Sequence, residues 1–133
     1  MEPGSEAVPY GLATSDRHSG HYWPSITVYR TLDPWREHWA ALHHQTQPPP
    51  ACPEPDLSEH MLIEVTAGQT PTGMARLEVT AVTLSHGTLL VQAGLHYPDG
   101  AATADMGSPF AALTTPAFDG PVSLDLSTHI DIV

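Results

Sequence analysis

Nine histidines are the residues of this chain best suited to bind a metal ion or to transfer protons near neutral pH. The densest group falls in a segment that is predicted below to be helical. His38 and His43 are five residues apart, and the adjacent His43 and His44 diverge by about 100° around a helix. Only Glu37 and His44, seven residues apart, share a face, and two ligands do not complete a zinc site. The spacing therefore predicts no metal site, and a histidine-based metal-binding protein or metal-dependent hydrolase stays as the alternative.

A nucleophilic or nucleotide-binding centre is not indicated either. The single cysteine, Cys52, lies among prolines without the base or the helix N-terminus that activates a thiol, and it can form no intramolecular disulfide. The sequence has no Gly-x-Ser-x-Gly elbow and no Asp-x-Asp-x-Asp calcium loop, and residues 68–73 lack the Gly-Lys-Ser ending of a phosphate-binding loop. We therefore expect no catalytic residues, no cofactor and no enzyme activity.

The charge and composition restrict the partners. The 133 residues carry 15 acidic side chains against four arginines and no lysine, a formal net charge of −11, so nucleic acid and anionic membrane surfaces are not expected partners. With 41% hydrophobic residues the chain can fold, and its length predicts one domain over 1–133. The sequence has no apolar run of the roughly 20 residues that a membrane helix needs. The expected location is cytoplasmic if Met1 is the native start, and extracytoplasmic if an export leader was trimmed.

Proline and glycine divide the chain into four parts. Residues 1–24 are predicted to be an irregular surface arm with one short strand near Tyr10 to Thr14. Residues 25–47 contain a strand over 26–29 and then a helix. A proline-rich connector, 48–58, follows, because proline cannot continue a helix and favours extended chain. Residues 59–133 are β-rich.

The helix is predicted over residues 34–45. Asp33 offers a side-chain oxygen to cap the free backbone N–H groups, and Pro34 suits the first helical position. The apolar stripe consists of Trp35, Trp39 and Leu42, spaced at i, i+4 and i+7. The two tryptophans are expected to join this helix to a sheet.

The second half of the chain changes to the period of two that is typical of strands. Apolar and polar residues alternate, and turn residues bound the predicted strands at 61–66, 77–81, 89–95, 110–114 and 122–126. Ser85-His86-Gly87 predicts an antiparallel hairpin. The predicted fold is mostly β (all-β or α+β): an antiparallel β-sandwich or open barrel with one packed helix. Edge strands of such a sheet can pair two copies of the chain, so a homodimer stays open.

One segment between two predicted strands resembles a known signature. Gly68-Gln69-Thr70-Pro71-Thr72-Gly73 is similar to the Gly-x-x-Pro-Thr-Gly-Gly-Tyr motif of the PrcB C-terminal-domain family. Other segments follow in the order of that family, from Ser19-Gly20, Trp35 to Trp39 and Asp56-Leu57-Ser58 to Leu89-Leu90-Val91, Pro98-Asp99-Gly100 and Ser108-Pro109-Phe110. The resemblance covers about residues 10–116 and departs at Met74 and Ala75, where the family has a second glycine and an aromatic residue.

The resemblance implies a non-catalytic accessory subunit that stabilises a surface protease complex. The expected partner is accordingly a protein, such as a protease or an envelope complex, and no membrane insertion is expected. The same loop is distantly similar to the binding loop of chagasin-type cysteine protease inhibitors, so a protease inhibitor is a second alternative. Proline stiffens this loop, threonines offer hydrogen bonds and methionine offers adaptable apolar contact. The predicted partner-binding residues are Gln69, Thr70, Pro71, Thr72, Gly73 and Met74.

Overall fold

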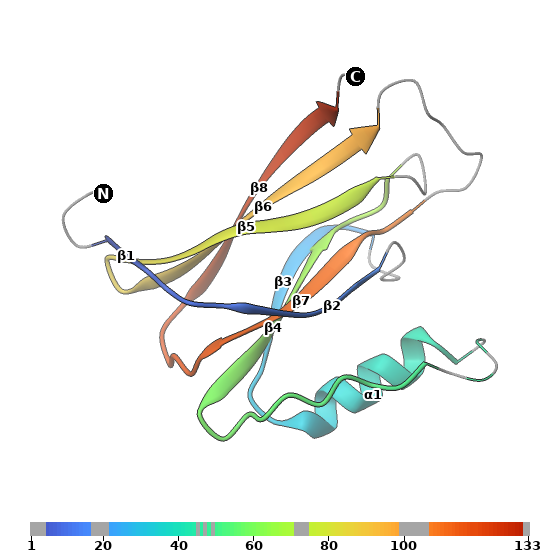
Figure 1. Cartoon of the computed structure of the whole chain (residues 1–133), viewed down its shortest axis with the longest axis horizontal. Coiled ribbons are helices and arrows are strands. Elements are labelled where there is room, and N and C mark those ends of the chain that lie inside the picture. The colour runs from blue at the N-terminus through green and yellow to red at the C-terminus, as the bar shows by residue number, and fades with distance from the viewer. Residues whose placement is uncertain are drawn as a thin grey trace.

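The computed structural model describes residues 5–16, 22–44, 46, 48, 50–70, 75–98 and 107–131. Within these residues the chain forms two four-stranded sheets that face each other, and one helix lies outside them (Figure 1). The predicted mostly β fold, a sandwich with one packed helix, is confirmed.

The first sheet has the strand order β1-β5-β6-β8. Its strands are β1 (Ser5–Ala7), β5 (Arg76–Ser85), β6 (Thr88–Pro98) and β8 (Val122–Asp131). The predicted hairpin joins β5 to β6 through His86 and Gly87, whose φ angles of 52° and 80° are both positive, as a type I′ turn requires. The one departure from antiparallel pairing in this sheet is β8, which pairs with β6 in parallel because the chain crosses to the other sheet between them.

The second sheet has the order β2-β7-β4-β3, and all of its pairs are antiparallel. Its strands are β2 (Gly11–Asp16), β7 (Phe110–Pro116), β4 (His60–Ala67) and β3 (Pro24–Tyr29). The N-terminal arm is more regular than predicted, because it holds β1 as well as β2. The backbone N–H of Val8 donates to the carbonyl of Val82 at 2.9 Å as the chain leaves the first sheet for the second.

The main core lies between the two sheets. Strand β4 is buried on both faces. Its successive side chains point to opposite faces of the sheet, and both faces are covered. Met61, Ile63 and Val65 point into the space between the sheets with Val91 and Leu113, whereas the residues between them point to the other face. One face of β4 therefore packs in the main core, and its other face packs toward the helix.

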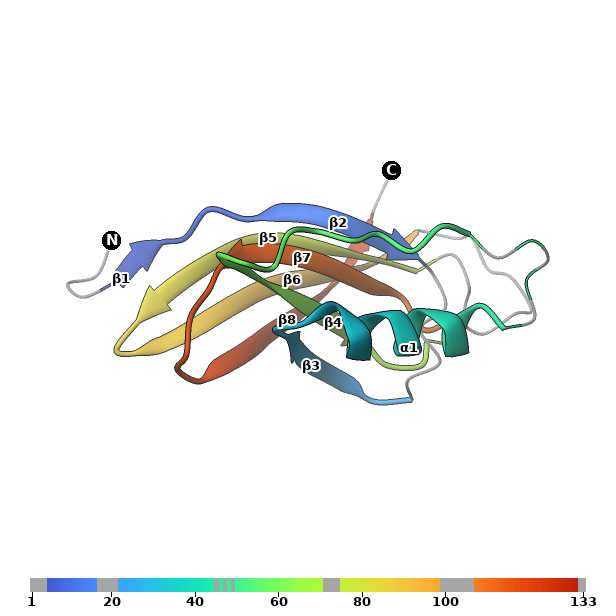
Figure 2. The same cartoon turned by 90° about the horizontal axis from the view of Figure 1, so that it is seen from below.

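Helix α1 (Leu32–Leu42) covers the outer face of the second sheet (Figure 2). Trp35 is fully buried and Trp39 nearly so, and both pack with Leu62 and Ala112, as predicted for a helix that is held on a sheet by tryptophans.

The start of this helix differs from the prediction. It begins with Leu32, and the N-cap position is Thr31 rather than Asp33. Pro34 is the third helical residue, where the missing N–H still has no intrahelical partner, and Asp33 pairs with Arg36 at 3.2 Å instead of capping. In the described part of the chain, no helix is long and apolar enough to cross a membrane.

Candidate functional site

The predicted partner-binding loop begins where β4 ends. Gly68 has a φ of 79°, Gln69 is exposed, and Thr70 is buried in a small antiparallel bridge with Gly107 whose N···O distances are 2.7 and 3.1 Å. The other four predicted residues, 71–74, lie outside the described residues. The structure thus places Gln69 on the surface and gives Thr70 a role in holding the loop.

Two exposed aromatic residues lie directly beside this loop. Tyr22 is 70% exposed and Trp23 is 79% exposed, the highest values among the large apolar residues of the described chain. The N–H of Gln69 donates to the carbonyl of Tyr22 at 3.1 Å, which joins the two segments. We call Tyr22, Trp23, Gly68 and Gln69 the aromatic corner. Tyr22 and Trp23 are not among the predicted site residues, because they fell in the predicted irregular arm.

The backbone of the aromatic corner is held tightly. The hydroxyls of Ser25 on β3 and Thr66 on β4 are hydrogen-bonded at 2.8 Å. The Thr66 hydroxyl also donates to the carbonyl of Trp23 at 3.3 Å. A Cβ at Gly68 would lie 2.9 Å from Pro24 N and from Trp23 C. Glycine is therefore needed at this position both for its positive φ and for the close approach of the two backbones.

Replacing Gly68 tests this close approach. Gly68→Ala is expected to lower the free energy of unfolding by more than Gly87→Ala, because the Cβ at residue 87 would meet nothing within 4 Å although its φ is 80°. The positive φ costs about 1–2 kcal/mol in both variants, and the clash adds about 1 kcal/mol or more at residue 68 alone. Urea denaturation of both variants measures the difference, and equal losses would contradict the close approach.

A buried ionisable pair connects α1 to β4. His38 Nε2 lies 2.7 Å from Glu64 Oε2, and the Glu64 side chain is 1% exposed. The ring of Tyr29 stacks near that of His38, with centroids 6.3 Å apart, and burial followed by the charge of Glu64 raises the pKa of Tyr29 to about 12. The hydrogen bond to Glu64 raises the pKa of His38 despite partial burial. Such a pair can hold a proton, but its contacts serve to fix the helix on the sheet.

The raised pKa of His38 predicts how stability changes with pH. Protonated His38 is favoured in the folded state, so its contribution is fully present below the unfolded pKa of about 6.5 and is lost as pH rises through the folded pKa. The free energy of unfolding of the wild type relative to His38→Gln should therefore decline above about pH 6.5. Chemical denaturation of both proteins from about pH 5 to about pH 9 measures this difference in the free energy of unfolding. A difference that grows with pH would contradict this assignment.

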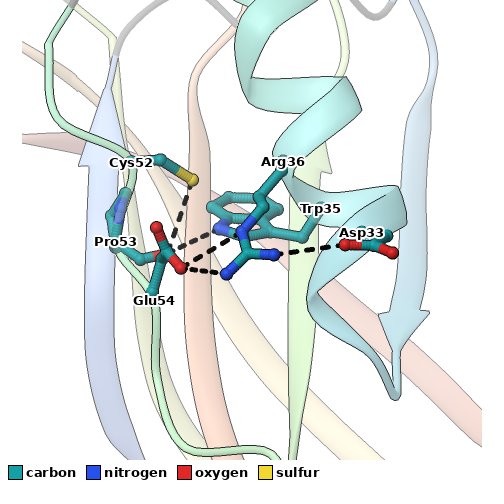
Figure 3. A network of polar contacts seen from close by, with 6 residues as sticks. All are labelled: Asp33, Trp35, Arg36, Cys52, Pro53 and Glu54. Carbon is teal, nitrogen blue, oxygen red and sulfur yellow. Dashed lines mark hydrogen bonds and ion pairs between the residues drawn. The ribbon is translucent and has the colours of Figure 1, made fainter.

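The proline-rich connector is bound along the helix (Figure 3). The indole N–H of Trp35 donates to the carbonyl of Pro53 at 2.8 Å, and that of Trp39 donates to the carbonyl of Pro50 at 3.0 Å. Arg36 pairs with Glu54 on the exposed side. The extended segment and the helix therefore pack as one unit.

Cys52 belongs to this structural unit. Its thiol donates to the carbonyl of Pro53 at 3.5 Å, and burial raises its pKa, with a smaller contribution from the charge of Glu54. A reactive cysteine needs the opposite shift. The environment of Cys52 thus favours a protonated, unreactive thiol.

The three histidines in and next to α1 have different neighbours. His38 contacts Glu64, His43 packs against Trp39 with ring centroids 4.4 Å apart, and Nδ1 of His44 lies 2.9 Å from the carbonyl of Ala41. Within the ranges that the structure describes, no three or more His, Cys, Asp or Glu side chains are arranged to hold a metal ion.

A shallow groove lies along the open edge between β2 and β5. It has a volume of about 290 Å³, and Tyr10, Leu12 and Val79 give it an apolar lining. The hydroxyl of Tyr10 donates to the carbonyl of Val79 at 3.3 Å across the groove. Ser15, Arg76 and Glu78 add polar groups to its lining.

Comparisons with known proteins identify no relative of the chain. The likeness to the PrcB C-terminal-domain family stays a prediction, carried by the motif at 68–73 and the order of the segments around it. No protein-family model matches the chain, and neither a curated protein nor a solved structure is significantly similar to it.

Proposed function

We propose that this protein is a non-catalytic module that binds another protein through the aromatic corner and the adjoining loop at 69–74. The observation that carries the proposal is the exposure of the consecutive residues Tyr22 and Trp23, at 70% and 79%, on one well-held stretch of backbone. Tryptophan and tyrosine are the residue types most enriched at the energetic centres of protein interfaces. Two such rings in solvent are an anchor for a partner rather than a contribution to folding.

The fixed backbone supports the same role. Hydrogen bonds from Gln69 to Tyr22 and from Thr66 to Trp23 hold the main chain beneath the rings, so binding orders few backbone torsions. Association loses less entropy when the binding surface is already ordered. The aromatic corner therefore has the chemistry and the rigidity of a recognition surface.

Charge indicates what kind of partner fits. With a formal net charge of −11, the protein repels acidic surfaces and attracts basic ones over distances of about a Debye length. We expect the partner to present a basic surface around an apolar pocket for the two rings. Added salt should then slow association more than it speeds dissociation.

The resemblance supplies the biological part of the proposal. We propose that the protein acts as an accessory subunit of a protease or envelope complex, as the likeness of the 68–73 motif to the PrcB C-terminal-domain family implies. A subunit of this kind needs a binding surface and no catalytic centre.

A capture experiment with surface variants tests the proposal. The tagged chain is used as bait for proteins of the source cell, beside Tyr22→Ala/Trp23→Ala and Thr72→Ala/Met74→Ala. Leu12→Ala is the matched control, because Leu12 is 61% exposed on β2, outside the aromatic corner. Candidate partners identified by mass spectrometry are purified, and their affinities are measured with the same four proteins.

The outcomes separate the parts of the proposal. A protease-complex or envelope protein that binds the wild type and the Leu12→Ala variant, but is lost with the aromatic variant, supports both the surface and the role. A partner of another class supports the surface and overturns the accessory role. Partners that bind all variants equally overturn the surface. Slow, tight inhibition of a purified protease would instead indicate an inhibitor.

A further inference from the structure

Two histidines are paired across the outer face of the first sheet, on strands β6 and β8. His96 and His129 are direct partners in the parallel register, and their rings stack with centroids 5.0 Å apart and an interplanar angle of 20°. Ala93 and Leu95 of β6 are buried in the main core, so the alternate residue His96 faces outward from the sandwich. The backbone register therefore brings two imidazoles from distant parts of the sequence to one point on the surface.

A glycine leaves space where the two rings converge. An ideal Cβ at Gly94 would lie 3.0 Å from Nε2 of His96 and 3.4 Å from Nε2 of His129. Both Nε2 atoms thus lie within 3.4 Å of the same point above residue 94. Glycine in the interior of a strand often marks a place where another group approaches the backbone closely. Any other residue at 94 would fill this space.

Polar groups surround the same point. Glu78 is the register partner of Gly94 on β5, and its Oε2 lies 3.6 Å from Nε2 of His96. Ser127 is the register partner of Gly94 on β8, and its hydroxyl lies 2.9 Å from Nε2 of His129. A carboxylate, a hydroxyl and two imidazoles thus lie around the backbone of Gly94 on the outer face of the sheet.

We propose that His96 and His129 form an exchangeable site for a divalent late transition-metal ion, bound through both Nε2 atoms above Gly94. Imidazole is a preferred ligand of Cu²⁺, Ni²⁺ and Zn²⁺, and affinity for a given site is highest for Cu²⁺. Each ring binds as the neutral tautomer with its proton on Nδ1, and the ion displaces the contacts that Ser127 and Glu78 make with Nε2. Water fills the remaining coordination positions.

The two-ligand composition determines what kind of site this is. Structural zinc sites use four protein ligands, whereas a pair of histidines holds an ion that exchanges with solvent and keeps open positions. The carboxylate of Glu78, whose Oε2 also lies 3.7 Å from a guanidinium nitrogen of Arg76, lies beside the ion without having to coordinate it. The site is therefore suited to reversible binding and not to holding the fold together.

Metal titration of the purified full chain tests the site. Binding of Cu²⁺ and, separately, of Zn²⁺ is followed by calorimetry, with His96→Gln, His129→Gln and Gly94→Ala as variants. His60→Gln is the control, because His60 is an exposed strand residue of the second sheet. Loss of one ligand is expected to weaken the tightest Cu²⁺ site by at least about 10-fold, the lower end of what loss of an outer-shell partner costs, and His60→Gln should leave it unchanged.

Gly94→Ala distinguishes this site from general histidine binding. It keeps every histidine but places a methyl group within 3.4 Å of both Nε2 atoms, where it crowds the ion, so it should weaken Cu²⁺ binding as the histidine variants do. The electron paramagnetic resonance spectrum of bound Cu²⁺ should show nitrogen coupling from two imidazoles in the wild type and from one in His129→Gln. Circular dichroism confirms that each variant is folded. Equal Cu²⁺ affinity in the wild type, His96→Gln and His129→Gln would overturn the proposal, as would tight binding by Gly94→Ala.

Discussion

Trp35→Ala is expected to lower the free energy of unfolding by about 3–5 kcal/mol, among the largest losses available to a single substitution in this chain. Trp35 is fully buried between α1 and the second sheet. Its ring contacts that of Tyr29 edge-on, with centroids 5.4 Å apart, and that of Trp39, with centroids 5.8 Å apart. The substitution leaves a cavity and also removes the indole N–H that binds the carbonyl of Pro53. Both the helix and the connector thus lose their main attachment.

Two other substitutions make this expectation specific. Trp35→Phe keeps a ring in the site but loses the N–H, so it should cost less than the alanine variant. Trp23→Ala removes an equally large but 79% exposed side chain, and it should change stability by no more than about 0.5 kcal/mol. Urea denaturation that is followed by circular dichroism measures all three. A similar loss for Trp23→Ala and Trp35→Ala would contradict the burial on which the argument depends.

His38→Ala is expected to cost about 3 kcal/mol, because it takes the imidazole away from a carboxylate that is almost wholly buried. Glu64 lies in the middle of β4, and His38 Nε2 is 2.7 Å from it. Removal of one member of such a pair lowers the free energy of unfolding by more than the intact pair contributes to it, because the remaining charge is buried without a partner.

A second substitution separates this cost from simple loss of packing. In the His38→Ala background, Glu64→Gln should restore part of the lost stability, because a neutral amide is less costly to bury than a carboxylate. The exposed His60→Gln serves as the control, with an expected change within about 0.5 kcal/mol. If Glu64→Gln lowers the stability of the His38→Ala protein further, the carboxylate makes stabilising contacts that outweigh its burial.

The elements that could be predicted are those set by local patterns. The alternation along Met61 to Thr66 gave the two faces of β4, and Ser85-His86-Gly87 gave the hairpin, because both depend on neighbours in the sequence. Trp35 and Trp39 identified the buried face of α1. The start of the helix was wrong by two residues, since Asp33 and Pro34 are compatible with several positions in a first turn.

The candidate sites depend on pairings that no local pattern contains. The exposed Tyr22 and Trp23 lie beside Gln69 only because β3 pairs with β4 in one register. His96 meets His129 through a parallel pairing, whereas the prediction was of a largely antiparallel sheet. Contacts of this kind are fixed by strand order and register, which the spacing of residues along the chain does not reveal.

The position of β7 in the second sheet has a consequence for synthesis of the protein. β7 lies between β2 and β4, so β2 has no partner in its sheet until residues 110–116 have left the ribosome. β6 likewise lacks its β8 neighbour until residues 122–131 have emerged. Until then the nascent chain presents unpaired strand edges and the apolar β4, features that promote aggregation. Folding is therefore expected to finish only after translation has passed β8.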